Sequence, residues 1–453
     1  MSSAVLPIDP SEIDDDGRTD PSAWWRVGFD NHTLPRLLLM VLIAAIVLRP
    51  WDFIPALASI KPVTLGLISI TGLLLMTGVS IHYFSMPLSR ALLILWVFML
   101  TGVFDSYSQA ETADFAIKYV QYLILFGLLG TLIDSIAALS MMVRVVVGVG
   151  GVLGLMAVQM DRAGAYSAEG RIEGLGDGML SDPNDLACML VTIAPLGLWL
   201  LRRGASVLDR GLALGCLASL GLGILVTQSR GGLLAVVAAG GFFLLISKVP
   251  LYRKVLAGLF GVGLFLYAAP DAVLQRYATI ASASQTDESA QSRLAVWKAG
   301  ARMFADHPFN GCGVGTFEQV YGSRYIDRVG AGDVWRSAHN AYVEAAAELG
   351  LPGFICWCVF ILGGVPLLWS RRQRLAAWIA GEEEIDPDVE DPVVDDARTL
   401  RYWSECAMAS LVAFLAAATF LSKGFDIDTV IFIGTAVAGC MLIDGFADQF
   451  AES

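Results

Sequence analysis

Residues 208–247 read LDRGLALGCLASLGLGILVTQSRGGLLAVVAAGGFFLLIS and contain two long apolar runs separated only by Gln228–Gly232. Apolar residues are continuous within each run instead of alternating with polar ones, which favours membrane helices over the strands of a membrane barrel. Each run has about the length that a helix needs to cross a bilayer, roughly 20 residues. The stretch therefore predicts a pair of membrane helices joined by a very short turn.

Similar runs recur along the whole chain. Of the 453 residues, 56% are hydrophobic and 16% are charged, whereas soluble domains average about 45–50% apolar and about 25% charged residues. The twelve runs cover residues 37–57, 60–80, 87–104, 116–134, 137–160, 185–201, 208–228, 231–247, 252–270, 341–369, 402–422 and 426–446. This pattern predicts an all-α polytopic membrane protein with about 12 transmembrane helices. It excludes a cytosolic enzyme, a disordered chain and a disulfide scaffold.

Lys and Arg in the short loops predict the orientation of these helices, because such residues are enriched on the cytoplasmic side. The basic residues of one side are Arg202, Arg203, Arg210, Lys248, Arg253, Lys254, Arg371, Arg372 and Arg374. That side is expected to be the cytoplasm and to hold both termini. Residues 161–184 and 271–340 then face outward. In a bacterial inner membrane, 271–340 becomes a large periplasmic loop.

The expected organisation follows from these spans. Two acidic runs, Asp9–Asp20 and Glu382–Asp396, are poor in aromatic residues and are predicted to be disordered. The predicted parts are a cytoplasmic tail at 1–34, nine helices over 35–270 with an outer loop at 161–184, a periplasmic loop at 271–340, three helices over 341–446 with an acidic cytoplasmic loop at 371–401, and a tail at 447–453. The net charge of -13 and the lack of a large basic cluster make nucleic acid an unexpected partner.

Three arginines are candidates for binding an anionic group. Arg230 lies between two apolar runs, where a charged side chain is costly and a functional role is the first hypothesis; anchoring to lipid headgroups is the structural alternative. Arg293 precedes Trp297 by one turn in a stretch whose apolar residues recur every three or four positions, which predicts an amphipathic helix in the periplasmic loop. Its apolar positions are Leu294, Trp297, Ala301 and Phe304. Arg171, in the glycine-rich 161–184 loop, is the third candidate, with a flexible surface loop as the alternative.

The segment Ser337–Tyr342 (SAHNAY) enters an apolar run and contains the candidate catalytic residue. Asn340 is a good helix N-cap, and Glu344 and Glu348 follow it on one stripe of the predicted helix. A polar stripe within a membrane helix faces a cavity or a protein partner, not lipid. His339 lies at the mouth of that stripe, and histidine titrates near neutral pH. The alternative is an interfacial histidine that only caps the helix.

These motifs together resemble the O-antigen ligase and Wzy-type polymerase superfamily of lipid-linked glycan transferases. The resemblance spans about residues 170–353. It lies in QSRGG at Gln228–Gly232, in Arg293-x-x-x-Trp297 followed by HPFNGCGVGTF at His307–Phe317, in HNAYVEAAAELGLPG at His339–Gly353, and in Gly170-Arg171 with Pro183-Asn184.

The resemblance implies a metal-independent, inverting glycosyltransferase that needs no cofactor and uses an undecaprenyl-pyrophosphate-linked glycan. Arg230, Arg293 and Arg171 would bind the pyrophosphate, and His339 would be the general base. Asn340, Tyr342, Glu344 and Glu348 would support them.

The acceptor could be a growing glycan, lipid A core or a protein side chain. We expect a Wzy-type polymerase of a surface polysaccharide or exopolysaccharide, with lipopolysaccharide ligation as the alternative. Membrane lipids, a chain-length regulator and a flippase are further candidate partners. A secondary transporter of an anionic substrate is the competing class, but its charged residues would lie near the bilayer midplane.

Overall fold

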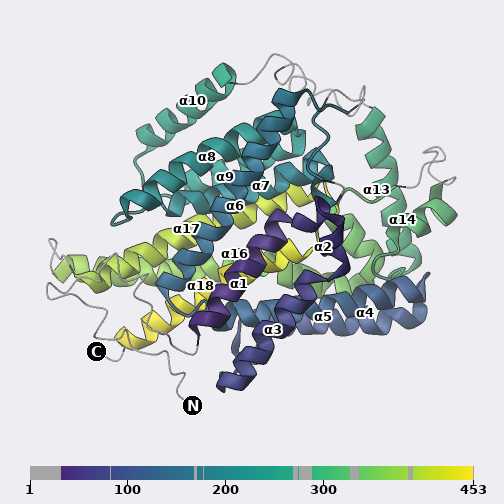
Figure 1. Ribbon diagram of the computed structural model, residues 1–453, viewed down its shortest axis with the longest axis horizontal. Helices are drawn as coiled ribbons and strands as arrows, with labels where there is room; N and C mark the ends of the chain where they lie inside the picture. Colours follow the sequence, from purple (N-terminus) through teal and green to yellow (C-terminus); the bar gives the residue numbers. More distant parts are fainter. Residues whose placement is uncertain are drawn as a thin grey trace.

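A computed structural model describes residues 32–81, 83–167, 171–176, 178–268, 274, 288–326, 336–385 and 391–451. These residues form an all-helical protein, and its one β-bridge joins Tyr166 to Ile172. The principal helices are α1 (Thr33–Leu48), α3 (Pro62–Thr77), α4 (Ser89–Gly102), α5 (Gln109–Leu132), α6 (Ile136–Ala163), α7 (Pro183–Trp199), α8 (Val207–Thr227), α9 (Arg230–Ile246), α10 (Leu251–Ala268), α13 (Glu288–Asp306), α16 (Ala341–Ile385), α17 (Pro392–Ala418) and α18 (Ile427–Ala451) (Figure 1). Shorter elements are α2 (Pro55–Ser59), η5 (Val103–Asp105), α14 (Phe317–Val320) and η8 (Tyr321–Tyr325).

Each predicted apolar run contains a helix, and the class of multi-pass membrane protein is confirmed. Six helices within the described residues are long and apolar enough to cross a membrane. They cover Thr33–Asp52, Gln109–Leu132, Ile136–Ala163, Val207–Thr227, Ala341–Glu382 and Ile427–Asp448, while Pro62–Thr77 and Arg230–Ile246 are shorter apolar helices. The number of twelve spans stays a prediction.

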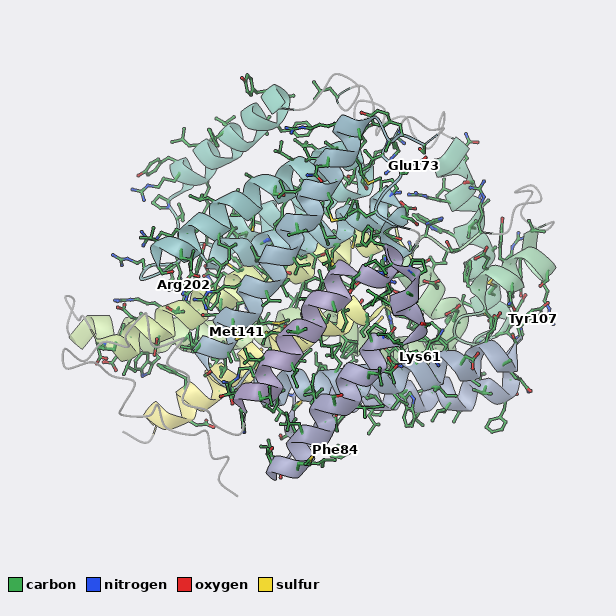
Figure 2. All side chains as sticks on the ribbon, viewed as in Figure 1. Lys61, Phe84, Tyr107, Met141, Glu173 and Arg202 are labelled. Carbon is green, nitrogen blue, oxygen red and sulfur yellow. The ribbon has the colours of Figure 1, made fainter. Side chains whose placement is uncertain are left out.

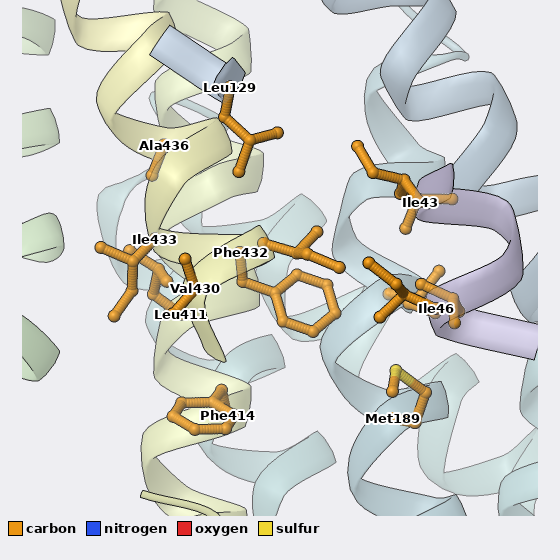
Figure 3. Close-up of a cluster of buried hydrophobic side chains, with 14 of the residues drawn as sticks. Ile43, Ile46, Leu129, Met189, Leu411, Phe414, Val430, Phe432, Ile433 and Ala436 are labelled. Carbon is orange, nitrogen blue, oxygen red and sulfur yellow. The ribbon is translucent and has the colours of Figure 1, made fainter. Parts of the chain in front are cut away.

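The core of the bundle joins helices from both ends of the sequence. Ile43 and Ile46 of α1 face Phe432 of α18, and Phe414 of α17 and Met189 of α7 lie below them (Figure 3). Glycines allow some of the helices to approach each other closely. A Cβ atom on Gly223 of α8 would lie only 2.8 Å from the Cα of Gly154 on α6. Small residues allow this approach, and close packing between helices stabilises membrane bundles where lipid provides little hydrophobic drive.

Two segments differ from the expected organisation. The first apolar run, 37–57, is broken, because α1 ends at Leu48 and Arg49 is left-handed with φ of 55° before Pro50. The expected loop at 371–401 is largely helical where it is described, since α16 continues to Ile385 and α17 begins at Pro392. Asp391 caps α17 by accepting a hydrogen bond from the Val393 N–H at 2.7 Å, so an acidic residue that suggested disorder instead starts a helix. The acidic tail at 1–31 lies outside the described residues.

Candidate active site

The turn between α8 and α9 places Arg230 at a helix N-terminus. Gln228 ends α8 in a left-handed conformation with φ of 51°. Ser229 is the N-cap of α9, and its hydroxyl accepts a hydrogen bond from the Gly232 N–H at 3.1 Å. Arg230 is therefore the first residue of α9. Exposed N–H groups and the helix dipole make such an N-terminus favourable for anions.

Arg171 is buried beside this turn and joins two motifs that are distant in sequence. Its guanidinium donates to the Thr227 carbonyl at 3.1 Å and to Asn184 Oδ1 at 3.0 Å. Asn184 Oδ1 also accepts a hydrogen bond from the Ser229 hydroxyl at 2.9 Å. Asp182 caps α7 and accepts from the Asn184 N–H at 2.6 Å. The structure thus brings the Arg171, Asn184 and QSRGG segments into one hydrogen-bonded cluster.

The predicted amphipathic helix is α13, and it supports the segment that carries His339. The Trp297 indole N–H donates to the Ala338 carbonyl at 3.0 Å. The buried face differs from the predicted one: Leu294 is 42% exposed and Ala301 is exposed. The buried residues are Val296, Ala299, Gly300 and Met303. Gly300 decides this orientation, because a Cβ atom there would collide with Val343 of α16.

His339 is half-buried and has a strained backbone, with φ of 44°. Its N–H donates to the Ser422 hydroxyl at 3.1 Å. Burial lowers the pKa of the His339 imidazole below its usual value, the charges of Arg293 and Arg336 lower it further, and Asp182 opposes them. The imidazole is consequently neutral at pH 7, the form that can accept a proton. Arg293 and Asp182 are close enough to act on it electrostatically.

Asn340 and Tyr342 hold the start of α16. Asn340 Oδ1 accepts hydrogen bonds from the N–H groups of Tyr342 and Val343, each at 3.0 Å, which is the cap geometry expected from the sequence. The Tyr342 hydroxyl donates to the Leu415 carbonyl at 3.1 Å, and its ring packs edge-on against Trp357. Both residues therefore fix the start of α16, which directly follows His339.

Glu348 binds the glycine-rich turn that follows α13. Its side chain is buried, and its carboxylate accepts hydrogen bonds from the backbone N–H groups of Gly315, Thr316 and Phe317, the last at 2.9 Å. The Cys312 N–H donates to the Ala347 carbonyl at 2.9 Å on the same helix. A Cβ atom on Gly311 would collide with the Glu348 backbone, which explains the glycine. The polar stripe of α16 thus faces a protein loop.

The turn between α17 and α18 completes the site, although in the sequence its Asp426-Ile427-Asp428 segment suggests only a structural role. Phe420 packs against Gly231 next to Arg230, and the Ser422 hydroxyl bonds to both the His339 N–H and the Glu344 carboxyl. Lys423 is buried, with its ammonium 3.1 Å from Asp426 and 3.6 Å from Asp185. Burial disfavours that ammonium, but the neighbouring carboxylates outweigh it and raise its pKa. The sequence signal that could have identified this turn is Lys423 followed by Asp426 and Asp428 at the junction of two apolar runs.

The contacts of Asn184, Phe420 and Ser422 connect the segments that carry Arg171, Arg230 and His339. The charge of Arg293, on α13, lowers the pKa of His339. No curated protein matches the chain. Residues 214–358 match the O-antigen ligase family. This range includes Arg230, Arg293 and His339, whereas Arg171 and the α17–α18 turn lie outside it. The match covers about a third of the chain, and it confirms the predicted resemblance to the O-antigen ligase and Wzy-type superfamily.

Proposed function

We propose that this protein transfers a glycan from a polyprenyl pyrophosphate to an acceptor hydroxyl at the outer face of the bacterial inner membrane. The observation that carries the proposal is the position of His339 within electrostatic reach of Arg293 and linked, through the turn between α17 and α18, to the start of α9 that holds Arg230. Ser422 and Phe420, two residues apart in one turn, contact the His339 backbone and the start of α9 respectively.

The arginines supply the positive charge that this reaction needs. When the acceptor oxygen attacks the anomeric carbon, the bond to the pyrophosphate breaks and negative charge develops on the leaving oxygen. Guanidinium groups bind phosphate oxygens in bidentate geometry and remain charged in a partly dry site. Arg230 and Arg293, with Arg171, would bind the leaving pyrophosphate. Because these cations need no metal, EDTA should leave the activity of the purified protein unchanged.

His339 would accept the proton of the attacking hydroxyl. Its lowered pKa keeps the imidazole available as a base at pH 7, and general base catalysis typically contributes about 10²–10⁴-fold to the rate. A single displacement of this kind inverts the anomeric configuration. Product analysis by NMR of the new linkage therefore tests the mechanism, and retention of configuration would contradict it.

The decisive test uses purified protein in liposomes with the lipid-linked donor and an acceptor glycan. Formation of a longer glycan without any other component supports the transferase. Movement of the intact donor or of an anionic solute without transfer would instead support the transporter alternative.

The proposal also requires an outward site in a chain of twelve spans. A cysteine-free variant carrying Gln285→Cys should react with an impermeant maleimide only from outside the cell, and one carrying Asp388→Cys only from inside. Labelling of both positions from the same side would contradict this topology.

For the acceptor, we propose a growing glycan, which makes the protein a surface polysaccharide polymerase. Acidic residues accompany the arginines in the segment predicted to face outward, among them Asp306 and Glu318, whereas a phosphorylated lipid A core favours a strongly basic surface. The description of the matched family favours ligation to lipid A as the second candidate. A deletion strain separates the two. Single lipid-linked repeats would accumulate without a polymerase, and full-length polymer on its carrier would accumulate without a ligase. Unglycosylated protein would indicate protein O-glycosylation instead.

A further inference from the structure

A separate polar cavity lies beyond Glu348, on the other side of the glycine-rich turn. Its volume is about 200 Å³. It is formed between the turn after α4 and the segment that connects α13 to η8. Its lining residues are Asp105, Ser106, Tyr107, His307, Cys312, Val320 and Arg324. Figure 2 shows Tyr107 and Arg202 at opposite ends of the bundle.

The chemistry of this cavity suits a carbohydrate. The guanidinium of Arg324 lies 4.7 Å from the centre of the Tyr107 ring, and that tyrosine is 40% exposed. Asp105 Oδ2 accepts a hydrogen bond from the Asn310 amide at 2.5 Å. A sugar presents hydroxyl groups around its edge and C–H groups on its faces. Its hydroxyl groups can bond to a carboxylate, an imidazole or a guanidinium, and its C–H groups can pack against an aromatic ring. The Asp105 carboxylate disfavours a phosphate.

The volume of the cavity limits the size of the ligand that it can hold. Sites for drug-sized molecules enclose about 300–1,000 Å³, so the smaller cavity has room for about one sugar ring. Its walls are well fixed. The Tyr107 N–H donates to the Cys312 carbonyl at 3.0 Å, and the Thr112 hydroxyl donates to the Val314 carbonyl at 3.1 Å. A site held by backbone contacts of this kind loses little conformational entropy on binding.

The cavity and the catalytic histidine are connected through α16. His339 precedes this helix, and Glu348 on the same helix holds the turn that forms one cavity wall. Seven residues separate Ala341 from Glu348, which corresponds to about 10 Å along the helix. The cavity is therefore beyond hydrogen-bonding reach of the reacting bond, and a sugar bound there would belong to a different unit of the same glycan.

We propose that this cavity is a glycan subsite that binds one sugar unit remote from the bond being formed. The inference rests on the proposed transferase function. A remote sugar held equally well in the ground state and in the transition state lowers KM and leaves kcat unchanged. The bound sugar comes from either the donor glycan or the acceptor glycan, and the two sources are separated by varying one substrate at a time.

The test compares Tyr107→Ala with the matched control Tyr107→Phe, which keeps the ring. The donors are undecaprenyl pyrophosphate carrying a single sugar or the complete repeat of the producing strain, and the acceptors are glycans of the same two lengths. For one long substrate, Tyr107→Ala should raise KM about tenfold, while kcat stays within a factor of two and the short substrate is unaffected. Tyr107→Phe should resemble the wild type.

A donor-specific rise in KM assigns the cavity to the donor, and an acceptor-specific rise assigns it to the acceptor. Equal effects on short and long substrates, or normal KM values for both, would overturn the subsite. If Tyr107→Ala fails to fold, the exposed Arg324→Gln serves in the same comparison. Loss of transfer by the wild type itself would refute the proposed function instead, so the two failures are distinguishable.

Discussion

The two ends of the bundle hold their arginines differently. At the end nearest the termini, arginines bind carboxylates of other helices: Arg144 lies 2.6 Å from Asp209, and Arg372 lies 2.8 Å from Glu405. At the opposite end, Arg49 also pairs with a carboxylate, 2.6 Å from Asp52, but Arg171 donates to the Thr227 carbonyl and the Asn184 amide oxygen. The ion pairs join helix to helix and fix the bundle, whereas the Arg171 hydrogen bonds join the 161–184 segment to the turn between α8 and α9, where the proposed site lies.

The largest loss of activity should come from replacing His339, in the proposed active site. Replacement by Asn removes the base but tolerates a left-handed backbone, so His339→Asn should reduce kcat about 10²–10⁴-fold with a normal thermal unfolding temperature. His339→Ala should be equally inactive and less stable, because alanine disfavours φ of 44°. Transfer above about a tenth of the wild-type rate in the Asn variant would make His339 a structural residue.

Breaking the Arg372–Glu405 pair should affect stability and not catalysis. Both side chains are largely buried, and Arg372 also donates to the Ile246 carbonyl at 2.6 Å. Arg372→Ala should lower the free energy of unfolding by about 1–3 kcal/mol, since the buried Glu405 carboxylate loses its closer partner and keeps only Arg401 at 3.6 Å. Thermal unfolding in detergent measures this loss. The double variant Arg372→Met/Glu405→Leu should recover most of it, and KM values should not change in either protein.

Replacing Arg230 or Arg293 by Lys tests whether the proposed active site needs a guanidinium or only a positive charge. A lysine cannot reproduce bidentate contacts to a pyrophosphate, so each variant should lose about 10²-fold in kcat/KM, nearly as much as the corresponding Ala variant. Steady-state kinetics with the lipid-linked donor gives the ratio. Normal activity of both Lys variants would assign these arginines to membrane anchoring.

A smaller loss of stability is expected from replacing Glu348, whose carboxylate binds the glycine-rich turn. Glu348→Gln keeps an oxygen that accepts the Phe317 N–H and should change the stability of the turn little. Glu348→Ala leaves buried N–H groups without an acceptor and should cost about 1–3 kcal/mol. Limited proteolysis between α13 and α14 reports on the turn directly. Equal protection of both variants would contradict the role assigned to this carboxylate.

The smallest effect concerns pH. Burial and the arginines lower the pKa of His339 below the usual value of about 6.5 for histidine. The imidazole therefore stays mostly neutral down to pH 6.5, and the base is lost only as the pH falls through the lowered pKa. The kcat/KM, which reports the pKa of the free enzyme, should therefore decrease less than twofold between pH 7.5 and pH 6.5. A decrease by half or more over this interval would mean that the imidazole is not shielded as the structure indicates.

Hydropathy predicted the helical membrane class well, because a spanning helix must satisfy its backbone hydrogen bonds internally and be apolar over most of its length. It did not predict the orientation of α13. The periodicity of Leu294 and Ala301 was real, but Gly300 allows close contact with Val343, so a neighbouring face is buried. The acidic residues near 391 suggested a loop, whereas Asp391 caps α17. In both cases a contact with another segment or a local cap decided the outcome.

The sequence by itself determined the class of the protein, the candidate residues His339, Arg230, Arg293 and Arg171, and the cap at Asn340, since each follows from local composition or short spacing. Only the tertiary structure decided which distant segments meet. Asn184 binds both Arg171 and Ser229, and Ser422 binds the His339 backbone across 83 positions of sequence. The physical reason is that hydrophobic periodicity specifies which face of a helix is buried, but not which partner buries it. That choice depends on packing, on the close approach of glycines and on hydrogen bonds that form only after the helices assemble.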